Sequence, residues 1–236
     1  MRDMTLRARD AIERADTVVG YSTYVRLVGP LLEDKKIVST GMTTEVERCR
    51  EAISLAAEGR SVALISSGDP GVYGMAGLVL ELLKEEEESP LPFELEIIPG
   101  VPAVCSAAAS LGAPLMHDFA VISLSDLLTP WELIEKRLSL AAEGDFIIAL
   151  YNPRSKGRPD NLSVALEIIR RYRHADTPVG VVKDSAREGE KITVTTLKDI
   201  PVEKIDMTTI VIVGNSKSFP FLDYIVTPRG YKGKRL

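Results

Sequence analysis

LISSGDPGVYG, at residues 64–74, is the stretch that decides the fold. A short apolar run at 61–65 leads directly into glycine, aspartate and proline, which are the residues of a tight turn. A helical pattern follows at about 75–84, so the stretch is typical of a strand, a loop and a helix. Glycine lets a loop approach a ligand closely, and a carboxylate accepts hydrogen bonds. The stretch is therefore either a tight strand-to-helix connection or a ligand-binding loop.

The same alternation continues on both sides of this loop. Apolar spacing and caps predict helices and strands in turn, ending in a Pro99-Gly100 turn and a helix of small residues. This order predicts a parallel sheet with helices on its faces, and ligands bind at the carboxyl edge of such sheets. The predicted elements are helix 6–12 after the cap Thr5, strand 17–20, helix 43–58, strand 61–65, helix 75–84, strand 93–98 and a helix to 112.

A second set of elements follows Ala113-Pro114-Leu115, which we interpret as a domain junction. The sequence thus predicts an N-terminal α/β domain at 1–114 and a C-terminal α/β domain at 115–236. The elements predicted in the second domain are strand 119–124, helix 131–142, strand 146–150, helix 161–172 and strands 178–182, 191–195 and 209–213.

Composition excludes several classes of protein. The net charge of −5 argues against a nucleic-acid partner. No apolar run approaches the roughly 18–20 residues that span a bilayer, and the first residues lack the pattern of a signal sequence. We therefore expect a cytoplasmic protein without a membrane partner. The two cysteines and two histidines lack metal-ligand spacing, so no metal site is expected. Without a G-x-G-x-x-G fingerprint, a nicotinamide-dependent oxidoreductase is a weaker alternative.

Several motifs resemble one known family. Residues 64–74 resemble the GDP loop of tetrapyrrole methylases, and IIPGV at 97–101 resembles the turn that follows the next strand of that family. HDFAVISLSDLLTPW at 117–131 resembles the branch that methylates carbon 17 of precorrin-3B or cobalt-precorrin-3, and 149–155, 213–216 and 227–231 agree with it. The resemblance covers nearly the whole chain. It implies the class III methyltransferase fold, with two α/β domains and a cofactor cleft between them.

The resemblance also implies the cofactor, S-adenosylmethionine, which leaves as S-adenosylhomocysteine. A proline at Pro102 is a departure, because the family usually carries a hydroxyl residue there and proline also lacks an amide donor. The family usually has an apolar strand and a glycine-rich loop just before the position of Met4. We therefore expect either that the first domain lacks that strand or that the start site was placed too far downstream. The implied cofactor contacts are Ser67, Gly68, Asp69, Val72, Pro102, Ala103, Tyr151, Asn152, Ser185, Asn215 and Ser216.

By the same resemblance the reaction is methylation at carbon 17 with ring contraction, giving precorrin-4 or cobalt-precorrin-4 in cobalamin biosynthesis. Contraction needs acid/base groups, for which the candidates are His117, Asp118, Ser125 and Asp126. His117 is equally interpreted as a hinge residue bonded to a carbonyl, Asp118 as a turn cap, and Ser125 as a helix cap. The candidates for binding the carboxylates of the tetrapyrrole are Arg154, Lys156, Arg158, Lys183 and Arg187, which are alternatively solvated loop residues.

Two alternatives and one question about the substrate stay open at this point. The chain could be another member of the family, such as a different precorrin methylase or a diphthine synthase, although residues 117–131 argue against it. It could also be a module that binds the cofactor without turnover. The sequence does not say whether the substrate carries cobalt. The resemblance further implies a homodimer.

Overall fold

The computed structural model describes residues 3–41, 44–85 and 90–231, and its chain divides into two compact units. The first unit is 1–102 and the second is 103–236. The division therefore precedes the junction expected at 114, and the helix that follows Pro99-Gly100 belongs to the second unit.

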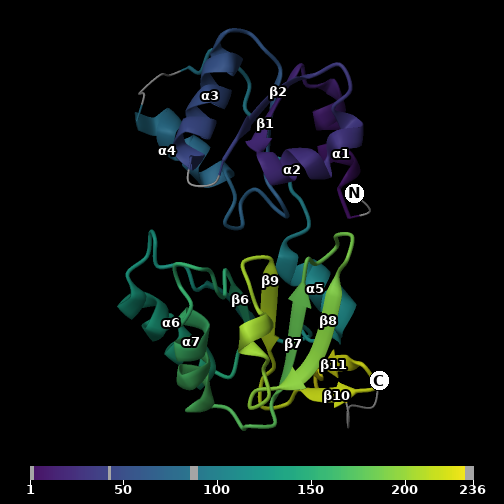
Figure 1. The fold of residues 1–236 in the computed structure, drawn as a ribbon, viewed down its shortest axis with the longest axis vertical. Helices are drawn as coiled ribbons and strands as arrows, with labels where there is room; N and C mark the ends of the chain where they lie inside the picture. Colours follow the sequence, from purple (N-terminus) through teal and green to yellow (C-terminus); the bar gives the residue numbers. More distant parts are fainter. Residues whose placement is uncertain (1–2, 42–43, 86–89, 232–236) are drawn as a thin grey trace. The chain divides into compact units, whose positions relative to one another are not determined.

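The first unit is built on a three-stranded sheet with the order β2-β1-β3, and all its strands are parallel (Figure 1). This confirms the parallel sheet predicted from the alternation of helices and strands. Its elements are α1 (Leu6–Arg14), β1 (Thr17–Tyr21), α2 (Ser22–Leu27), a 3-10 helix (Gly29–Leu31), β2 (Lys36–Thr40), α3 (Glu45–Ala57), β3 (Val62–Ile65) and α4 (Ala76–Glu85). The start expected for α3, at Thr43, lies outside the described residues.

Side chains alternate along the strands of this sheet, and each face carries its own layer of helices. Val18 and Ile65 pack with Ile12 of α1 and Val25 of α2. On the opposite face, Leu64 packs against α3 and α4. A strand presents successive side chains to opposite faces, so both sides of the sheet are covered (Figure 1).

The strand predicted at 93–98 is wrong: the structure forms no strand there. Polar and apolar residues alternate in this segment as they do in a strand, but none of the described residues pairs with it. Without a hydrogen-bonded neighbour the backbone groups of the segment form no β-ladder. Its contacts run instead to the start of α1, where Arg7 forms an ion pair with Glu96 and the Thr5 hydroxyl donates to the carbonyl of Pro99 at 3.1 Å. These two contacts fix the segment, up to the Pro99-Gly100 turn, against the start of α1.

The second unit contains a mixed five-stranded sheet with the order β5-β6-β9-β7-β8 (Figure 1). Strands β5 and β6 are parallel, whereas β9 runs antiparallel to both β6 and β7, and β8 runs antiparallel to β7. The elements are α5 (Ala103–Leu111), β4 (Gly112–Ala113), β5 (Phe119–Ser123), α6 (Trp131–Glu143), β6 (Ile147–Tyr151), α7 (Asn161–Arg170), β7 (Pro178–Lys183), β8 (Lys191–Thr196), a 3-10 helix η2 (Val202–Lys204), β9 (Thr209–Val213), β10 (Phe219–Phe221) and β11 (Tyr224–Val226).

Two apolar layers enclose this sheet. Ile148 and Leu150 face α6 and α7 in the larger core cluster, whereas Ile147 faces α5 in the smaller one. Strands β10 and β11 form a hairpin that continues to β4. Within the described part of the chain, every helix is too short or too polar to cross a lipid bilayer.

The two cysteines differ in environment, which gives a first prediction. Cys49 is buried on α3 and burial raises its pKa to about 11 from 9.0, while Cys105 on α5 is exposed. Since the thiolate is the reactive form, iodoacetamide at pH 8 should label Cys105 in the native protein and both cysteines in urea. The buried neutral thiol stabilises the fold below pH 9, and this stabilisation is lost as the pH rises toward about 11.

Mass spectrometry of the labelled peptides checks the prediction. Equal labelling rates of the two cysteines in the folded protein would contradict it. A Cys49→Ala variant serves as the control for the alkaline part, because its stability should lack the loss that the thiol causes.

Candidate active site

Asp69 joins two loops that are distant in the sequence of the first unit. Its Oδ1 accepts a hydrogen bond from the Gly71 amide at 2.8 Å, and its Oδ2 accepts one from the Gly100 amide at 2.9 Å. The GDP loop after β3 and the Pro99-Gly100 turn are therefore held together by one carboxylate. Hydrogen bonds to an ionised group are stronger than neutral ones, so this bridge fixes the relative position of the two loops.

The backbone of these loops requires glycine at the contact. Gly68 has a φ of +74°, and Tyr73 has a φ of +55°, which is uncommon for a residue with a side chain. A Cβ added to Gly100 would overlap the carbonyl oxygen of Gly68. The loops thus approach each other backbone to backbone.

The remaining candidates of the first unit lie on the same loops. Ser67 and Gly68 are exposed, and Asp69, Val72 and Pro102 are half-buried. The Val72 amide donates to the carbonyl of Asp69 at 3.2 Å, which closes the turn after the carboxylate. The structure therefore gathers the implied cofactor contacts of this unit at the carboxyl end of β3.

In the second unit, three implied cofactor contacts meet at the first turn of α5. The Tyr151 hydroxyl accepts a hydrogen bond from the Val104 amide at 2.8 Å, next to Ala103. The Ser185 hydroxyl lies 2.9 Å from that of Ser106. Tyr151 ends β6 and Ser185 follows β7, so both residues lie at one edge of the sheet.

The same edge carries left-handed backbone at residues other than glycine. Asn152 has a φ of +50°, Asp184 of +51° and Ala186 of +58°. Such conformations cost energy and cluster at functional sites. The Asn152 side chain donates to the Ser123 hydroxyl at 2.9 Å, which ties the ends of β6 and β5 together.

Asn215 and Ser216 lie at the opposite edge, so the expectation that they join Tyr151 and Ser185 is corrected. The sequence identified 209–213 as a strand but not its direction, and β9 is antiparallel to β6, which pairs Val213 with Ile148 near the start of β6. The end of β9 thus adjoins the beginnings of β6 and β7.

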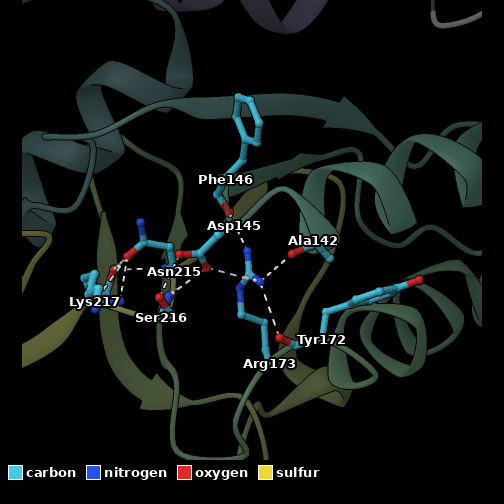
Figure 2. A network of polar contacts seen from close by, with 9 residues as sticks. Ala142, Asp145, Phe146, Tyr172, Arg173, Asn215, Ser216 and Lys217 are labelled. Atoms are coloured by element: carbon cyan, nitrogen blue, oxygen red, sulfur yellow. Dashed lines mark hydrogen bonds and ion pairs between the residues drawn. The ribbon is translucent and has the colours of Figure 1, made fainter.

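The polar groups of these two residues are engaged in the fold (Figure 2). Asn215 is buried, and its Oδ1 accepts from the amides of Lys217 and Ser218 at 2.9 and 3.1 Å. The Ser216 hydroxyl donates to Asp145 at 2.7 Å, and Asp145 lies 3.3 Å from the buried guanidinium of Arg173. This cluster connects β9 to the segment before β6 and is a structural network.

The acid/base candidates are also divided between the two edges. His117 and Asp118 precede β5, whereas Ser125 and Asp126 follow it, and a strand of five residues is roughly 17 Å long. Nδ1 of His117 accepts from the amide of its neighbour Asp118 at 3.0 Å, and both side chains are largely exposed. The four candidates therefore do not form one group within this unit.

Arg158 brings Ser125 and Asp126 together. Its Nη1 donates to the Ser125 hydroxyl and lies 3.9 Å from Oδ1 of Asp126. The Arg158 side chain is only 11% exposed, whereas that of Asp126 is 40% exposed. The arrangement places a mostly buried cation beside an accessible carboxylate and a hydroxyl at the carboxyl edge of β5.

A pocket of about 660 Å³ opens near this edge, between the loop after β6 and the segment before β9. Three of the predicted carboxylate-binding residues line it: Arg154, Lys156 and Lys183. Arg158 and Arg187 are not among its lining residues, and Arg187 lies in the turn after β7. Sequence reasoning missed Glu203, Lys204 and Asp206 of the same pocket, because they lie on and after η2, ahead of a strand whose direction was unknown.

Charge is partly compensated inside the pocket. The Lys183 ammonium donates to Oδ2 of Asp206 at 2.5 Å, and this bond raises the pKa of Lys183. Partial burial favours the protonated form of Asp206, but hydrogen bonds from Lys183 and from Thr208 and Thr209 outweigh it and lower its pKa. Both groups are therefore charged at neutral pH.

Known proteins resemble this chain over most of its length. Residues 1–201 match the family model described as tetrapyrrole (corrin/porphyrin) methylases. A probable cobalt-factor III C(17)-methyltransferase of Salmonella typhimurium is 52% identical over 228 residues, which cover 97% of this chain and 93% of that protein. A cobalt-factor III methyltransferase of Priestia megaterium is 52% identical over 232 residues, but the match covers 98% of this chain and 43% of that longer protein.

A solved structure agrees with these matches. The crystal structure of the methyltransferase CobJ superposes with a TM-score of 0.91 at 40% identity, covering 97% of this chain and 95% of that one. The fold, the carboxylate-bridged loops and the extent of these matches lead to one conclusion. This chain belongs to the tetrapyrrole (corrin/porphyrin) methylase family.

Proposed function

We propose that this chain transfers a methyl group from S-adenosylmethionine to carbon 17 of a cobalt-bearing tetrapyrrole, cobalt-factor III, and contracts the ring in cobalamin biosynthesis. The observation that carries the proposal is the 52% identity over 97% of the chain to the Salmonella relative, whose name specifies that carbon. The Priestia relative, also 52% identical, has cobalt in its name as well, which favours the cobalt-bearing substrate over precorrin-3B. Cobalt would arrive with the substrate.

The cofactor would supply the methyl group on a sulfonium, from which a neutral thioether leaves readily. The residues present suit it, because alignment rather than a nucleophilic side chain is what such a transfer requires. In the first unit, the loops joined by Asp69 offer backbone amides and a carboxylate, with Ser67, Gly68, Val72 and Pro102 beside it. The second unit offers Ala103, Tyr151, Asn152 and Ser185 at the carboxyl edge of its sheet. Asn215 and Ser216 are not part of this set.

Proton transfer during ring contraction is assigned to the group of Ser125, Asp126 and Arg158. Asp126 is accessible and would accept a proton, while Arg158 beside it orients the Ser125 hydroxyl. His117 and Asp118 lie at the other edge and are left without a role in this proposal. The pocket of about 660 Å³ would receive carboxylate arms of the substrate.

We also propose that the enzyme is a homodimer in the cytoplasm. This expectation comes from the family resemblance and not from a surface of the described residues. Light scattering of the purified chain distinguishes a dimer from a monomer.

Calorimetric titration with S-adenosylhomocysteine tests the cofactor assignment. Wild-type protein should bind with micromolar affinity, and Asp69→Ala should weaken binding about tenfold or more, or some 1.4 kcal/mol, because the two loops lose their bridge. Asp10→Ala, at an exposed carboxylate on α1, is the matched control and should bind like wild type. A lack of binding by the wild type would contradict the assigned cofactor. Binding without methylation of cobalt-factor III would instead favour a module that has lost turnover.

A further inference from the structure

The basic side chains that line the pocket beside η2 are of two kinds. Its lining residues include four basic and two acidic side chains: Arg154, Lys156, Lys183, Lys204, Glu203 and Asp206. Two of the basic side chains have hydrogen-bond or ion-pair partners in the pocket walls, and two do not contact a carboxylate or carbonyl of the described residues. This difference indicates which of them is available to a ligand.

Arg154 and Lys183 have partners in the pocket walls. Arg154 donates from Nε to the carbonyl of Pro159 at 3.2 Å and from Nη1 to the carbonyl of Glu203 at 3.3 Å. It therefore connects the loop after β6 to η2. Lys183 is neutralised by Asp206, which Thr208 and Thr209 hold in place with hydrogen bonds of 3.0 and 3.1 Å. These two cations shape the pocket.

Lys156 and Lys204 are exposed, and within the described residues their ammonium groups contact no carboxylate or carbonyl. They come from two different walls, Lys156 from the loop after β6 and Lys204 from the end of η2 before β9. Since β6 and β9 are neighbours in the sheet, the two lysines flank the pocket. After the pairing of Lys183 with Asp206, Glu203 is the acidic side chain left beside them, so the opening is net positive.

We infer that Lys156 and Lys204 each bind a peripheral carboxylate arm of the tetrapyrrole, whereas Arg154 and Lys183 are positioning residues. The inference rests on the proposed function for the nature of the substrate. A lysine ammonium is a point charge on a flexible stem. It therefore suits flexible acetate and propionate arms better than the rigid, bidentate guanidinium of an arginine does. The pocket of about 660 Å³ lies within the roughly 300–1,000 Å³ usual for small-molecule sites. Lys204 thereby becomes a binding residue that the motifs of the sequence did not indicate.

Kinetics of Lys156→Gln, Lys204→Gln and the double variant test this assignment. Each single variant should raise KM for cobalt-factor III about tenfold with kcat nearly unchanged, because a contact made equally in the ground and transition states is lost. The double variant should raise KM about a hundredfold, and S-adenosylhomocysteine affinity should stay at the wild-type value. Lys136→Gln, at an exposed lysine on α6, is the control and should leave KM unchanged.

A second readout does not need turnover. Quenching of uroporphyrin fluorescence measures the affinity for a stable tetrapyrrole that carries many carboxylates, and both lysine variants should weaken it. The wild-type affinity should fall more steeply with added salt than that of the double variant, since screening acts on the lost charges. Unchanged KM and uroporphyrin affinity in Lys204→Gln, with an active wild type, would overturn the inference. An inactive wild type whose uroporphyrin affinity still depends on the lysines would overturn the proposed function alone.

Discussion

Gly100→Ala should reduce the affinity for S-adenosylhomocysteine by about a hundredfold or more, or roughly 2.7 kcal/mol. The new Cβ would overlap the carbonyl oxygen of Gly68, and a backbone carbonyl cannot turn aside as the end of a flexible side chain can. Separation of the loops would also break the hydrogen bond from the Gly100 amide to Asp69. Calorimetric titration measures the loss.

Gly77→Ala is the matched control for this experiment. Gly77 lies in α4, and a Cβ added there meets nothing within 4 Å. Alanine is the better helix former by about 1 kcal/mol, so this variant should bind like wild type and be slightly more stable. Wild-type affinity in Gly100→Ala would show that the two loops need not approach so closely, and the cofactor site assigned to them would fail.

Arg173→Met should lower the free energy of unfolding by about 3–5 kcal/mol, as expected when one partner of a buried charge network is removed. The side chain of Arg173 is 4% exposed and donates to the carbonyls of Ala142 and Phe146 at 2.5 and 2.9 Å (Figure 2). Burial lowers its pKa, and the nearby Asp145 only partly opposes this. Methionine would fill the space but leave Asp145 without its cation and both carbonyls without donors.

Urea denaturation followed by circular dichroism measures this loss. Arg171→Met, at an exposed position two residues away, should change stability by less than about 0.5 kcal/mol. The affinity of folded Arg173→Met for S-adenosylhomocysteine should be unchanged, because the network lies at the edge of the sheet opposite Tyr151. A loss below about 1 kcal/mol would show that the network adds little to the fold.

Most elements were predictable because their side-chain patterns are local. The helices at 6–14 and 131–143 and the strands at 62–65 and 147–151 carry the apolar spacing of their type, and the structure confirms them. Three elements of the first unit were missed: α2, the 3-10 helix Gly29–Leu31 and β2. The short helix α2 begins at Ser22, and its N-cap residue Tyr21 forms no side-chain cap. Strand β2 is an edge strand that follows a turn at Asp34 with a φ of +60°.

What the sequence could not predict depends on partners far away in the chain. A run such as TIVIV at 209–213 is a strand in either direction, and only its neighbours decide which end meets which loop. That ambiguity misplaced Asn215 and Ser216 and concealed Lys204. The alternating segment 93–98 shows the reverse error, since a strand pattern has no effect without a partner strand.

The central position of β9 has a consequence for how the second unit is made. β9 pairs with β6 on one side and β7 on the other, and those two strands have no pairing with each other. During synthesis, the pairs β5-β6 and β7-β8 therefore emerge from the ribosome before residues 209–213. Until β9 is made, the edges of β6 and β7 that it covers have no hydrogen-bonded neighbour. Unpaired strand edges are templates for aggregation, and late, distant pairing is slow. The nascent chain is thus most vulnerable to aggregation between the completion of β8 at Thr196 and that of β9 at Val213. Translation crosses this interval in roughly one to three seconds at about 5–20 residues per second.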